Sequence, residues 1–344
     1  MDGCPCLASR NLRSYRLCMA VQSTARTDHH YIPQFLLRGF ASAKRKQVYV
    51  FDKSNDNEFR SSVRNLACQR DFYDPDLDKW LGKLEDTSAP IIQSIRTKRT
   101  LNHLQDAETQ WLAGFVAVQQ VRTLHHRAVS ADIDKQLADA LRGMGAEPNS
   151  VKNFHELTDS EIREQTNANI QGLSLDLLPY ILNKDWILFS AFSGSEFWIG
   201  DHPVALANNL NPGDGLRGTL GFGVPGIEIY LPISSELMLG CLCPSIRAMF
   251  AVSQAGRLPV VPRAEEFLRA FDGSTTLQLN SENLKYHNSL QVVNAERFVY
   301  SEHSTFDMVR EMVSSDETLR TGNRVETVGR RRQRQSGHPT PTQG

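Results

Sequence analysis

The stretch WILFSAFSGSEFWIGDHP, residues 186–203, decides the fold class, because the hydrophobic pattern of the chain changes its period there. Before this stretch, apolar residues recur at the three- and four-residue spacing of helices. Within it and after it, they form short runs that are rich in β-branched and aromatic residues. The turn Ser193-Gly194-Ser195 separates the runs Trp186–Phe192 and Glu196–Gly200. We therefore predict a β-hairpin at the border between a helical half and a β half.

Upstream of this border the pattern is mainly helical. Helices are predicted over residues 77–97, 106–130, 130–144 and 158–183, and the last begins at a capping-box sequence. Pro90 lies inside the first of these helices and is expected to kink or split it. The chain before these helices is predicted to form a strand at Lys46–Phe51 and a short helix whose start is set by Pro33.

Downstream of the border the β signal continues. Strands are predicted at 227–233 and 236–243, a strand or a packed segment at 297–301, and helices at 244–252, 263–271 and 281–294. The order is a strand, a helical half, and then a mostly antiparallel β half with late helices. This order predicts an α+β fold in which a largely helical N-terminal half packs on the β half.

Charge is distributed unevenly along the 344 residues. The formal net charge is −1, yet residues 29–318 hold 28 basic and 36 acidic side chains, so the basic excess lies in the two ends. The N-terminal apolar run Leu17–Val21 is too short for a secretion signal, and the tail has almost no apolar residues. We predict disordered basic ends at 1–27 and 319–344, a single α+β domain at 28–303 and a C-terminal helix at 304–318. The helical part of the domain is predicted at 77–184 and its β-rich part at 185–303.

Several classes of protein are excluded by composition. No apolar run is long enough to span a membrane, and six cysteines are too few for a disulfide scaffold. We therefore expect a cytoplasmic protein without membrane contact. HEXXH, Walker A, GxSxG and GxGxxG motifs are absent, and Cys241 and Cys243 have no second ligand pair to complete a zinc site. No metal-ligand set is therefore assigned.

Arg122 interrupts an apolar helical face. On a helical wheel it falls in the middle of the stripe formed by Trp111, Phe115 and Val118. A guanidinium keeps its charge, so its burial requires a carboxylate or an anionic ligand as partner. We expect Arg122 either to form a salt bridge at the end of the helix or to line a functional site. His126 lies beside Arg122 on the wheel and is a candidate contact for a substrate.

Two further groups of polar residues lie in unusual positions. His29 and His30 precede the short helix at Pro33, and imidazole titrates near neutral pH, which suits acid–base catalysis or metal binding. Adjacent residues of a strand face opposite ways, so at most one of the two is expected to point into a site. Asp201 and His202 follow the run EFWIG directly. A carboxylate at the end of a buried strand is either catalytic or bonded to nearby backbone in an Asx-turn.

The segment HHYIPQFLLRGFA, residues 29–41, resembles the opening of the bacterial domain-of-unknown-function family 4238 (DUF4238). Looser similarities span residues 28–303 and include the run FWIGDHPV and the ending AERFVYS. His202 departs from the Asn that the family pattern places there, which puts the role of position 202 in doubt. The resemblance implies domain boundaries and selects His30, Arg122 and Asp201, but it implies no reaction.

These residues support a hydrolase that acts on a phosphodiester or another small anionic substrate, and a metal-assisted nuclease is its most concrete form. Candidate catalytic residues are His30, His29, Asp201 and Arg122, and candidate substrate contacts are Gln34, Asn288 and His126. A hydrolase of this kind would use a divalent metal as its cofactor. The acidic body favours a small or single-stranded substrate over a long duplex. The alternatives are a non-catalytic module that binds a ligand or partner through the same residues, and a buried network that only joins the two halves.

Overall fold

The computed structural model describes residues 28–42, 46–210, 220–255 and 263–324. The predicted N-terminal extension, 1–27, and residues 325–344 of the predicted tail lie outside these ranges. Residues 319–324, also assigned to the tail, belong to the described structure. A short 3₁₀ helix spans Glu317–Arg320, and Arg320 pairs with Asp56.

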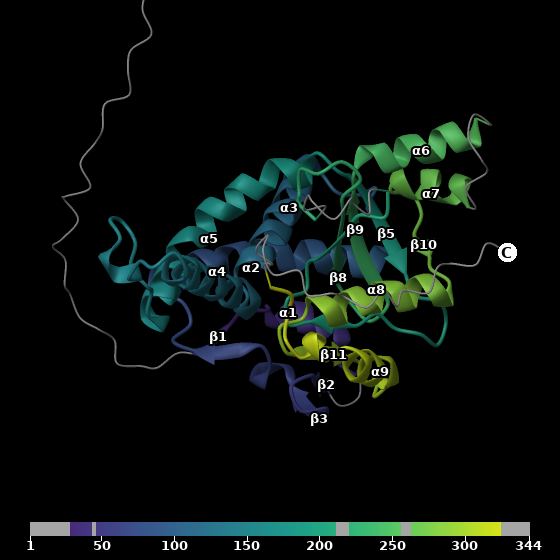
Figure 1. The fold of residues 1–344 in the computed structure, drawn as a ribbon. Helices are drawn as coiled ribbons and strands as arrows, with labels where there is room; N and C mark the ends of the chain where they lie inside the picture. Colours follow the sequence, from purple (N-terminus) through teal and green to yellow (C-terminus); the bar gives the residue numbers. More distant parts are fainter. Residues whose placement is uncertain (1–27, 43–45, 211–219, 256–262, 325–344) are drawn as a thin grey trace, which may run out of the picture.

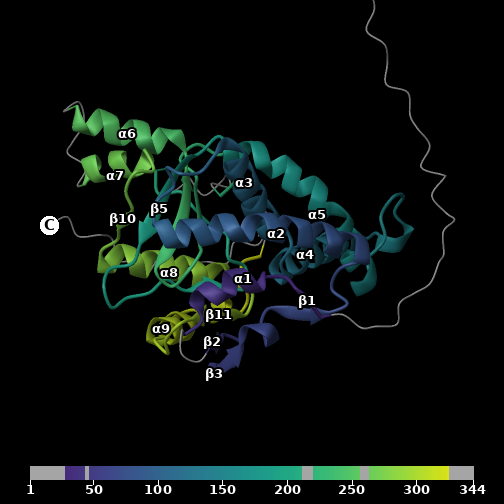
Figure 2. The ribbon, with the colours of Figure 1, turned by 180° about the vertical axis from the view of Figure 1, so that it is seen from behind.

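Long helices form the first half of the described chain. They are α2 (Pro75–Lys98), α3 (Asp106–Val121), α4 (Leu124–Gly143) and α5 (Asp159–Leu182). The Asp74 side chain caps α2, and the capping box of Thr158 and Glu161 starts α5 as predicted. Helix α2 continues through Pro90, so of the predicted kink or split the split is wrong. The short helix α1 (Gln34–Leu37) follows Pro33 and lies beside α2 (Figure 2).

The predicted helix 106–130 is divided in two by the structure. Helix α3 ends at Val121 and α4 begins at Leu124, so Arg122 and Thr123 form a break between them. Both residues bond groups on other elements. Arg122 bonds the β1 and α2 regions, and Thr123 bonds His202. These tertiary bonds override a periodic pattern that the sequence carries across the break.

The larger sheet has the strand order β10-β5-β9-β8-β7 and is antiparallel except at the β10–β5 pair. Its strands are β5 (Asp185–Ser190), β7 (Ala205–Ala207), β8 (Glu228–Pro232), β9 (Leu237–Leu242) and β10 (Leu277–Gln278). Strands β8 and β9, predicted at 227–233 and 236–243, form a tight antiparallel pair. Every residue of both strands is buried, which explains their continuous apolar pattern.

A second, wholly antiparallel sheet has the order β3-β2-β11-β6. Its strands are β2 (Gln47–Asp52), β3 (Asn57–Ser62), β6 (Ile199–Gly200) and β11 (Phe298–Ser301). A third, two-stranded sheet pairs β1 (Asp28–His30) with β4 (Cys68–Arg70). The predicted hairpin at 186–200 is wrong, because β5 pairs with β9 and β10 whereas β6 pairs with β11. Apolar alternation predicts a strand but does not select its neighbour.

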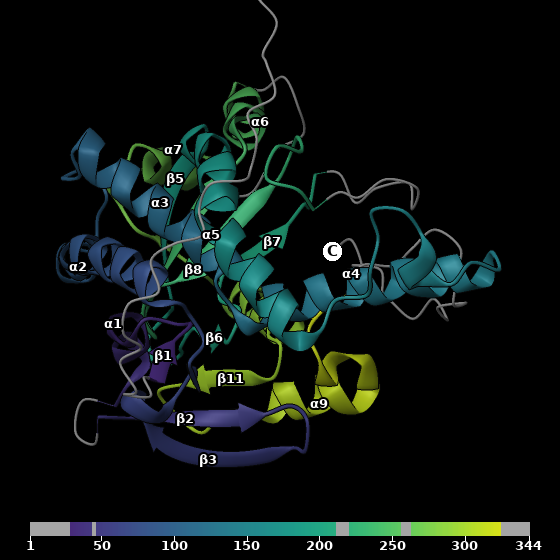
Figure 3. The same ribbon diagram turned by 90° about the vertical axis from the view of Figure 1, so that its left-hand side faces the viewer.

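The late helices complete the α+β fold predicted from the sequence. They are α6 (Pro244–Gln254), α7 (Ala264–Phe271), α8 (Ser281–Asn294) and α9 (Asp307–Ser315). Helices α6 and α7 lie beyond one end of the larger sheet (Figure 1). Helix α8 contacts both β7 and β6, so it lies between the edges of the two larger sheets. Helix α9 covers the four-stranded sheet, with its apolar residues against Phe51 and Val299 (Figure 3).

The main hydrophobic core joins α2, α3 and α5 to the five-stranded sheet. A smaller core lies between the four-stranded sheet, α8 and α9. No helix within the described residues is long and apolar enough to cross a membrane.

Candidate functional site

The family-like segment begins with β1, where His29 and His30 face opposite ways. The His29 ring points inward and is buried, and its Nδ1 accepts a hydrogen bond from the backbone N–H of Tyr73 at 3.0 Å. His30 is half-buried, and its Nε2 lies 3.0 Å from the carbonyl oxygen of Arg64. The alternation predicted for adjacent strand residues is therefore present, and His30 is the one at the surface.

The bond to Arg64 determines which nitrogen of His30 carries the proton in the neutral ring. A carbonyl oxygen only accepts, so Nε2 must donate to it. The second nitrogen, Nδ1, then holds a lone pair and is the basic atom of the side chain. The carbonyl of Arg64 thus fixes both the orientation and the neutral tautomer of the His30 ring.

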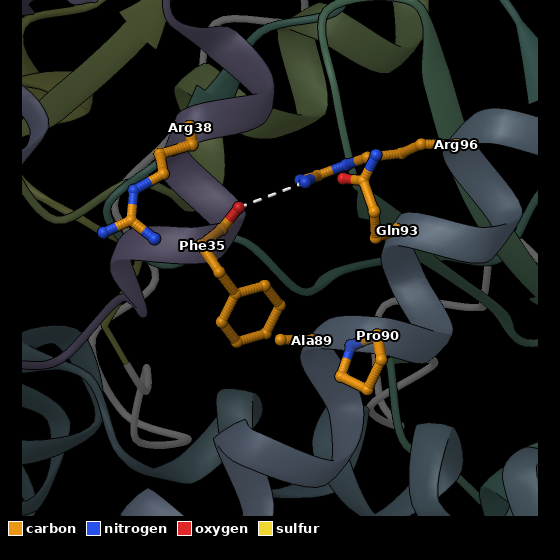
Figure 4. A pocket seen from close by; sticks show the side chains of 6 residues that line it. All are labelled: Phe35, Arg38, Ala89, Pro90, Gln93 and Arg96. Atoms are coloured by element: carbon orange, nitrogen blue, oxygen red, sulfur yellow. Dashed lines mark hydrogen bonds between the residues drawn. The ribbon is translucent and has the colours of Figure 1, made fainter.

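His30 lines a surface hollow of about 310 Å³ between α1 and α2. The hollow is lined by His30, Gln34, Phe35, Arg38, Glu85, Asp86 and Ala89. A neighbouring hollow of about 330 Å³ shares Phe35, Arg38 and Ala89 with it and continues along α2 to Arg96 (Figure 4). Arg38 is exposed, and its Nη2 donates to Oε1 of Gln34 at 3.2 Å.

Arg122 lies behind this hollow and is 2 % exposed. Its Nη1 donates to Glu85 at 2.7 Å, its Nη2 to the backbone oxygen of His30 at 2.7 Å, and its Nε to the Tyr73 hydroxyl at 3.2 Å. Burial opposes the charge, but the Tyr73 hydroxyl and the Glu85 carboxylate raise the pKa of Arg122 above its usual value. Arg122, which directly follows the end of α3, therefore forms a salt bridge with Glu85 of α2. All three of its side-chain nitrogens have partners. It positions His30 and Glu85.

Asp201 is fully buried at the end of β6. Its Oδ1 accepts from the backbone N–H of Glu296 at 2.6 Å, and its Oδ2 accepts from those of Arg297 and Phe298 at 2.9 and 3.0 Å. Burial raises the pKa of Asp201 to about 6, against the opposing effects of these three N–H groups and Lys53. Both oxygens thus hold the turn that leads into β11. The backbone bonding expected of an Asx-turn occurs here with a segment distant in sequence.

Position 202, which departs from the family pattern, lies in a separate cluster of histidines. His202 is buried, with Nδ1 2.7 Å from the Thr123 hydroxyl and Nε2 3.3 Å from the Gln120 amide. Its ring lies 4.4 Å from that of His125. Burial first, and then His125 and His126, lower the pKa of His202 far below its usual value. Burial likewise lowers the pKa of His126. Burial therefore favours the neutral rings of His202 and His126.

Asn288, on α8, binds the backbone of residues 196 and 198. Its Oδ1 accepts from the N–H of Trp198 at 2.9 Å and its Nδ2 donates to the oxygen of Glu196 at 3.0 Å. The side chain thus takes the place of a neighbouring strand beside residues 196–198. Gln291 does the same one turn later, bonding Gly200 and Pro203. A Cβ on Gly200 would lie 2.9 Å from the oxygen of Gln291, so this close approach requires glycine.

The predicted site residues therefore divide into groups. His30 and Gln34 line the hollow, and Arg122 supports it from behind through Glu85. Hydrogen bonds place Asp201 at the turn before β11 and Asn288 at the 196–198 segment. The pKa of His202 responds to His126, which places His126 with the histidine cluster. No hydrogen bond between described residues joins Asp201, Asn288 or His126 to the hollow.

Two residues of the hollow, Arg38 and Glu85, were not selected from the sequence. Arg38 follows Gln34 by four residues, which is the spacing of neighbours on one helix face, and this spacing could have identified it. Glu85 lies on the half-exposed side of α2 and carries no comparable signal. Over the ranges that the structure describes, no group of three or more His, Cys, Asp or Glu side chains could hold a metal ion.

Fold and site together define an α+β protein with a polar surface hollow between two N-terminal helices. The family described as "Protein of unknown function (DUF4238)" matches residues 28–305, and the chain belongs to this family. No curated protein and no solved structure matches the chain. The family match covers both the hollow and the buried networks around Arg122 and Asp201.

Proposed function

We propose that the protein is a hydrolase that acts on a small phosphodiester or a similar singly charged ester in the hollow between α1 and α2. The observation that carries this proposal is the orientation of His30. Its Nε2 donates to the carbonyl of Arg64, which leaves the lone pair of the neutral ring on Nδ1, and the residue lines a hollow of substrate size. A cytoplasmic location belongs to the same proposal.

The residues around His30 supply the remaining roles. Arg38, supported by Gln34, would hold an anionic oxygen of the substrate and stabilise the charge that develops on it. His30 Nδ1 would take a proton from water while the water oxygen bonds to phosphorus and the bond to the leaving oxygen breaks. The same proton then passes from His30 to the leaving oxygen, which departs as an alcohol.

The charges of the hollow favour a diester over a monoester. Glu85 is paired with Arg122, which leaves the exposed cation of Arg38 and the carboxylate of Asp86 as the other charged side chains that line this hollow. A phosphodiester brings one negative charge, whereas a phosphomonoester brings up to two near neutral pH. The second charge would face Asp86 without a second cation. Within the 29–318 body, the excess of acidic residues disfavours a long duplex in the same way.

The test is hydrolysis of bis(p-nitrophenyl) phosphate by the full chain, with and without EDTA. His30→Gln keeps an amide donor for the Arg64 carbonyl and removes the base. We expect this variant to lose about 100-fold or more of the activity. His155→Gln is the matched control, because His155 is an exposed histidine remote from the hollow in sequence. Equal activity in the wild type and His30→Gln overturns the proposal, and loss of activity in EDTA would support the predicted use of a divalent metal.

A second candidate is a module that binds the same ligand without turnover. It is favoured by the saturation of Arg122, Asp201 and Asn288, whose polar atoms serve the protein's own backbone and side chains. Calorimetric binding of bis(p-nitrophenyl) phosphate without release of p-nitrophenolate, lost in Arg38→Ala, would select this candidate.

A further inference from the structure

The second hollow has a different character from the first. Its walls include the Phe35 ring, Ala89 and the Pro90 ring, and Gln93 adds an amide (Figure 4). Phe35 and Ala89 also line the first hollow, which adds His30, Gln34 and two carboxylates, whereas the second hollow adds the Pro90 ring, Gln93 and Arg96. Arg38 belongs to both hollows. A ligand whose charge lies at Arg38 therefore has polar groups on one side and an apolar wall on the other.

The apolar wall is held in place by its surroundings. The Phe35 ring packs against Phe115 with centroids 5.4 Å apart, and its backbone oxygen accepts from Arg96 Nη1 at 3.1 Å. Arg96 also bonds the oxygens of Leu36 and Ile233, so its donors are used within the protein. Gly39 permits this arrangement, because a Cβ there would collide with the Arg96 guanidinium. The wall is thus pre-formed, and Arg38 is the cation left for a ligand.

We propose that the second hollow holds an aromatic ring of the substrate, so that the substrate class is a phosphodiester with at least one aryl or nucleobase-bearing arm. This inference rests on the proposed function, because it places the charged group at Arg38 between the two hollows. A flat ring gains more from the Phe35 ring than an alkyl group does, since aromatic pairs add to simple burial of apolar area. In proteins that bind single-stranded nucleic acid, the stacking of bases on aromatic side chains contributes enough affinity to decide which ligand binds.

The experiment compares the binding of diphenyl phosphate and dimethyl phosphate to the full chain by calorimetry. Both are diesters with one negative charge, and they differ in their arms. We expect diphenyl phosphate to bind about tenfold or more tightly. Ala89→Leu fills the hollow from the surface of α2 and should remove this preference, and Phe35→Leu, which keeps apolar volume without a ring, should reduce it. Lys83→Ala, on the same helix but outside both hollows, should leave it unchanged.

Equal affinity of the two diesters for the wild type overturns the inference, as does a preference that survives in both Ala89→Leu and Phe35→Leu. His30→Gln separates this test from that of the proposed function. If this variant and the wild type are equally inactive in hydrolysis but both prefer diphenyl phosphate, the hydrolase proposal fails and the aromatic pocket stands. If hydrolysis depends on His30 but no preference exists, the hydrolase stands and the aromatic pocket fails.

Discussion

At the scale of single residues, the main feature is a pair of buried charges whose partners come from distant parts of the chain. Arg122 bonds Glu85 and His30, and Asp201 bonds the backbone of residues 296–298. A buried charge is tolerated only when its donors or acceptors are satisfied. The polar atoms of these two candidate catalytic residues are therefore bonded within the protein.

Replacement of Arg122 tests this role. Arg122→Ala should lower the free energy of unfolding by about 3–5 kcal/mol, because it leaves the Tyr73 hydroxyl and the His30 carbonyl without their donor in the interior. Arg122→Lys should recover part of the loss, since it restores the charge without the planar fork. Urea unfolding measures both changes.

The matched control is Arg142→Ala, which removes an exposed arginine paired with Asp139 and Glu156. Surface pairs contribute about 0–1 kcal/mol, so this variant should remain close to the wild type. A loss below about 1 kcal/mol for Arg122→Ala would contradict the positioning role.

At the scale of elements, helix α8 acts as a clasp on an extended segment. Asn288, Gln291 and Asn294 follow one another at three-residue intervals and bond the backbone between Glu196 and Val204. Three-residue spacing places them along one side of the helix. They satisfy backbone groups of a segment that forms only the two-residue strand β6. By holding this segment, the helix positions Asp201 beside the turn before β11.

Removal of one member of the clasp should be measurable. Asn288→Ala leaves the buried N–H of Trp198 and the oxygen of Glu196 without side-chain partners, and we expect a loss of about 1–3 kcal/mol in unfolding free energy. The amide of Trp198 should also exchange its hydrogen faster. Asn283→Ala, at an exposed position of α8, is the control. Unchanged exchange at Trp198 would show that the clasp is not needed there.

At the scale of the whole molecule, ion pairs and hydrogen bonds tie the last described residues to the body. Arg324 donates to both oxygens of Glu296, at 2.6 and 2.8 Å, and Glu296 lies 3.0 Å from Nδ1 of His125 on α4. Burial alone would raise the pKa of Glu296, but the bonds from His125 and Arg324 and the charge of Arg324 lower it to about 2. This carboxylate joins α4, the α8–β11 connection and the C-terminal segment.

This link predicts a defined acid sensitivity. The pKa of Glu296 is lower in the folded chain than the value of about 4.3 expected in the unfolded chain. The stabilisation is therefore fully present above pH 4.3 or so and is lost as the pH falls towards 2. Its size corresponds to about 3 kcal/mol. Urea unfolding of the wild type and Glu296→Gln should show a difference at pH 6 that shrinks by pH 3, and a constant difference would rule out this role.

The sequence alone determined the α+β class, the helical and β halves, the strands that became β8 and β9, and the helix start at Thr158. These features depend on local period, capping and turn chemistry, which act between neighbours in the chain. Only the tertiary structure decided that β5 and β6 belong to different sheets and that a helix breaks at Arg122. It also decided that His30 lines a hollow with Arg38 and Glu85, while Asp201 serves a turn. The physical reason is that strand partners, ion pairs and buried hydrogen bonds join residues that lie far apart in the chain, as Arg320 and Lys53 do. Apolar periodicity carries no record of those partners.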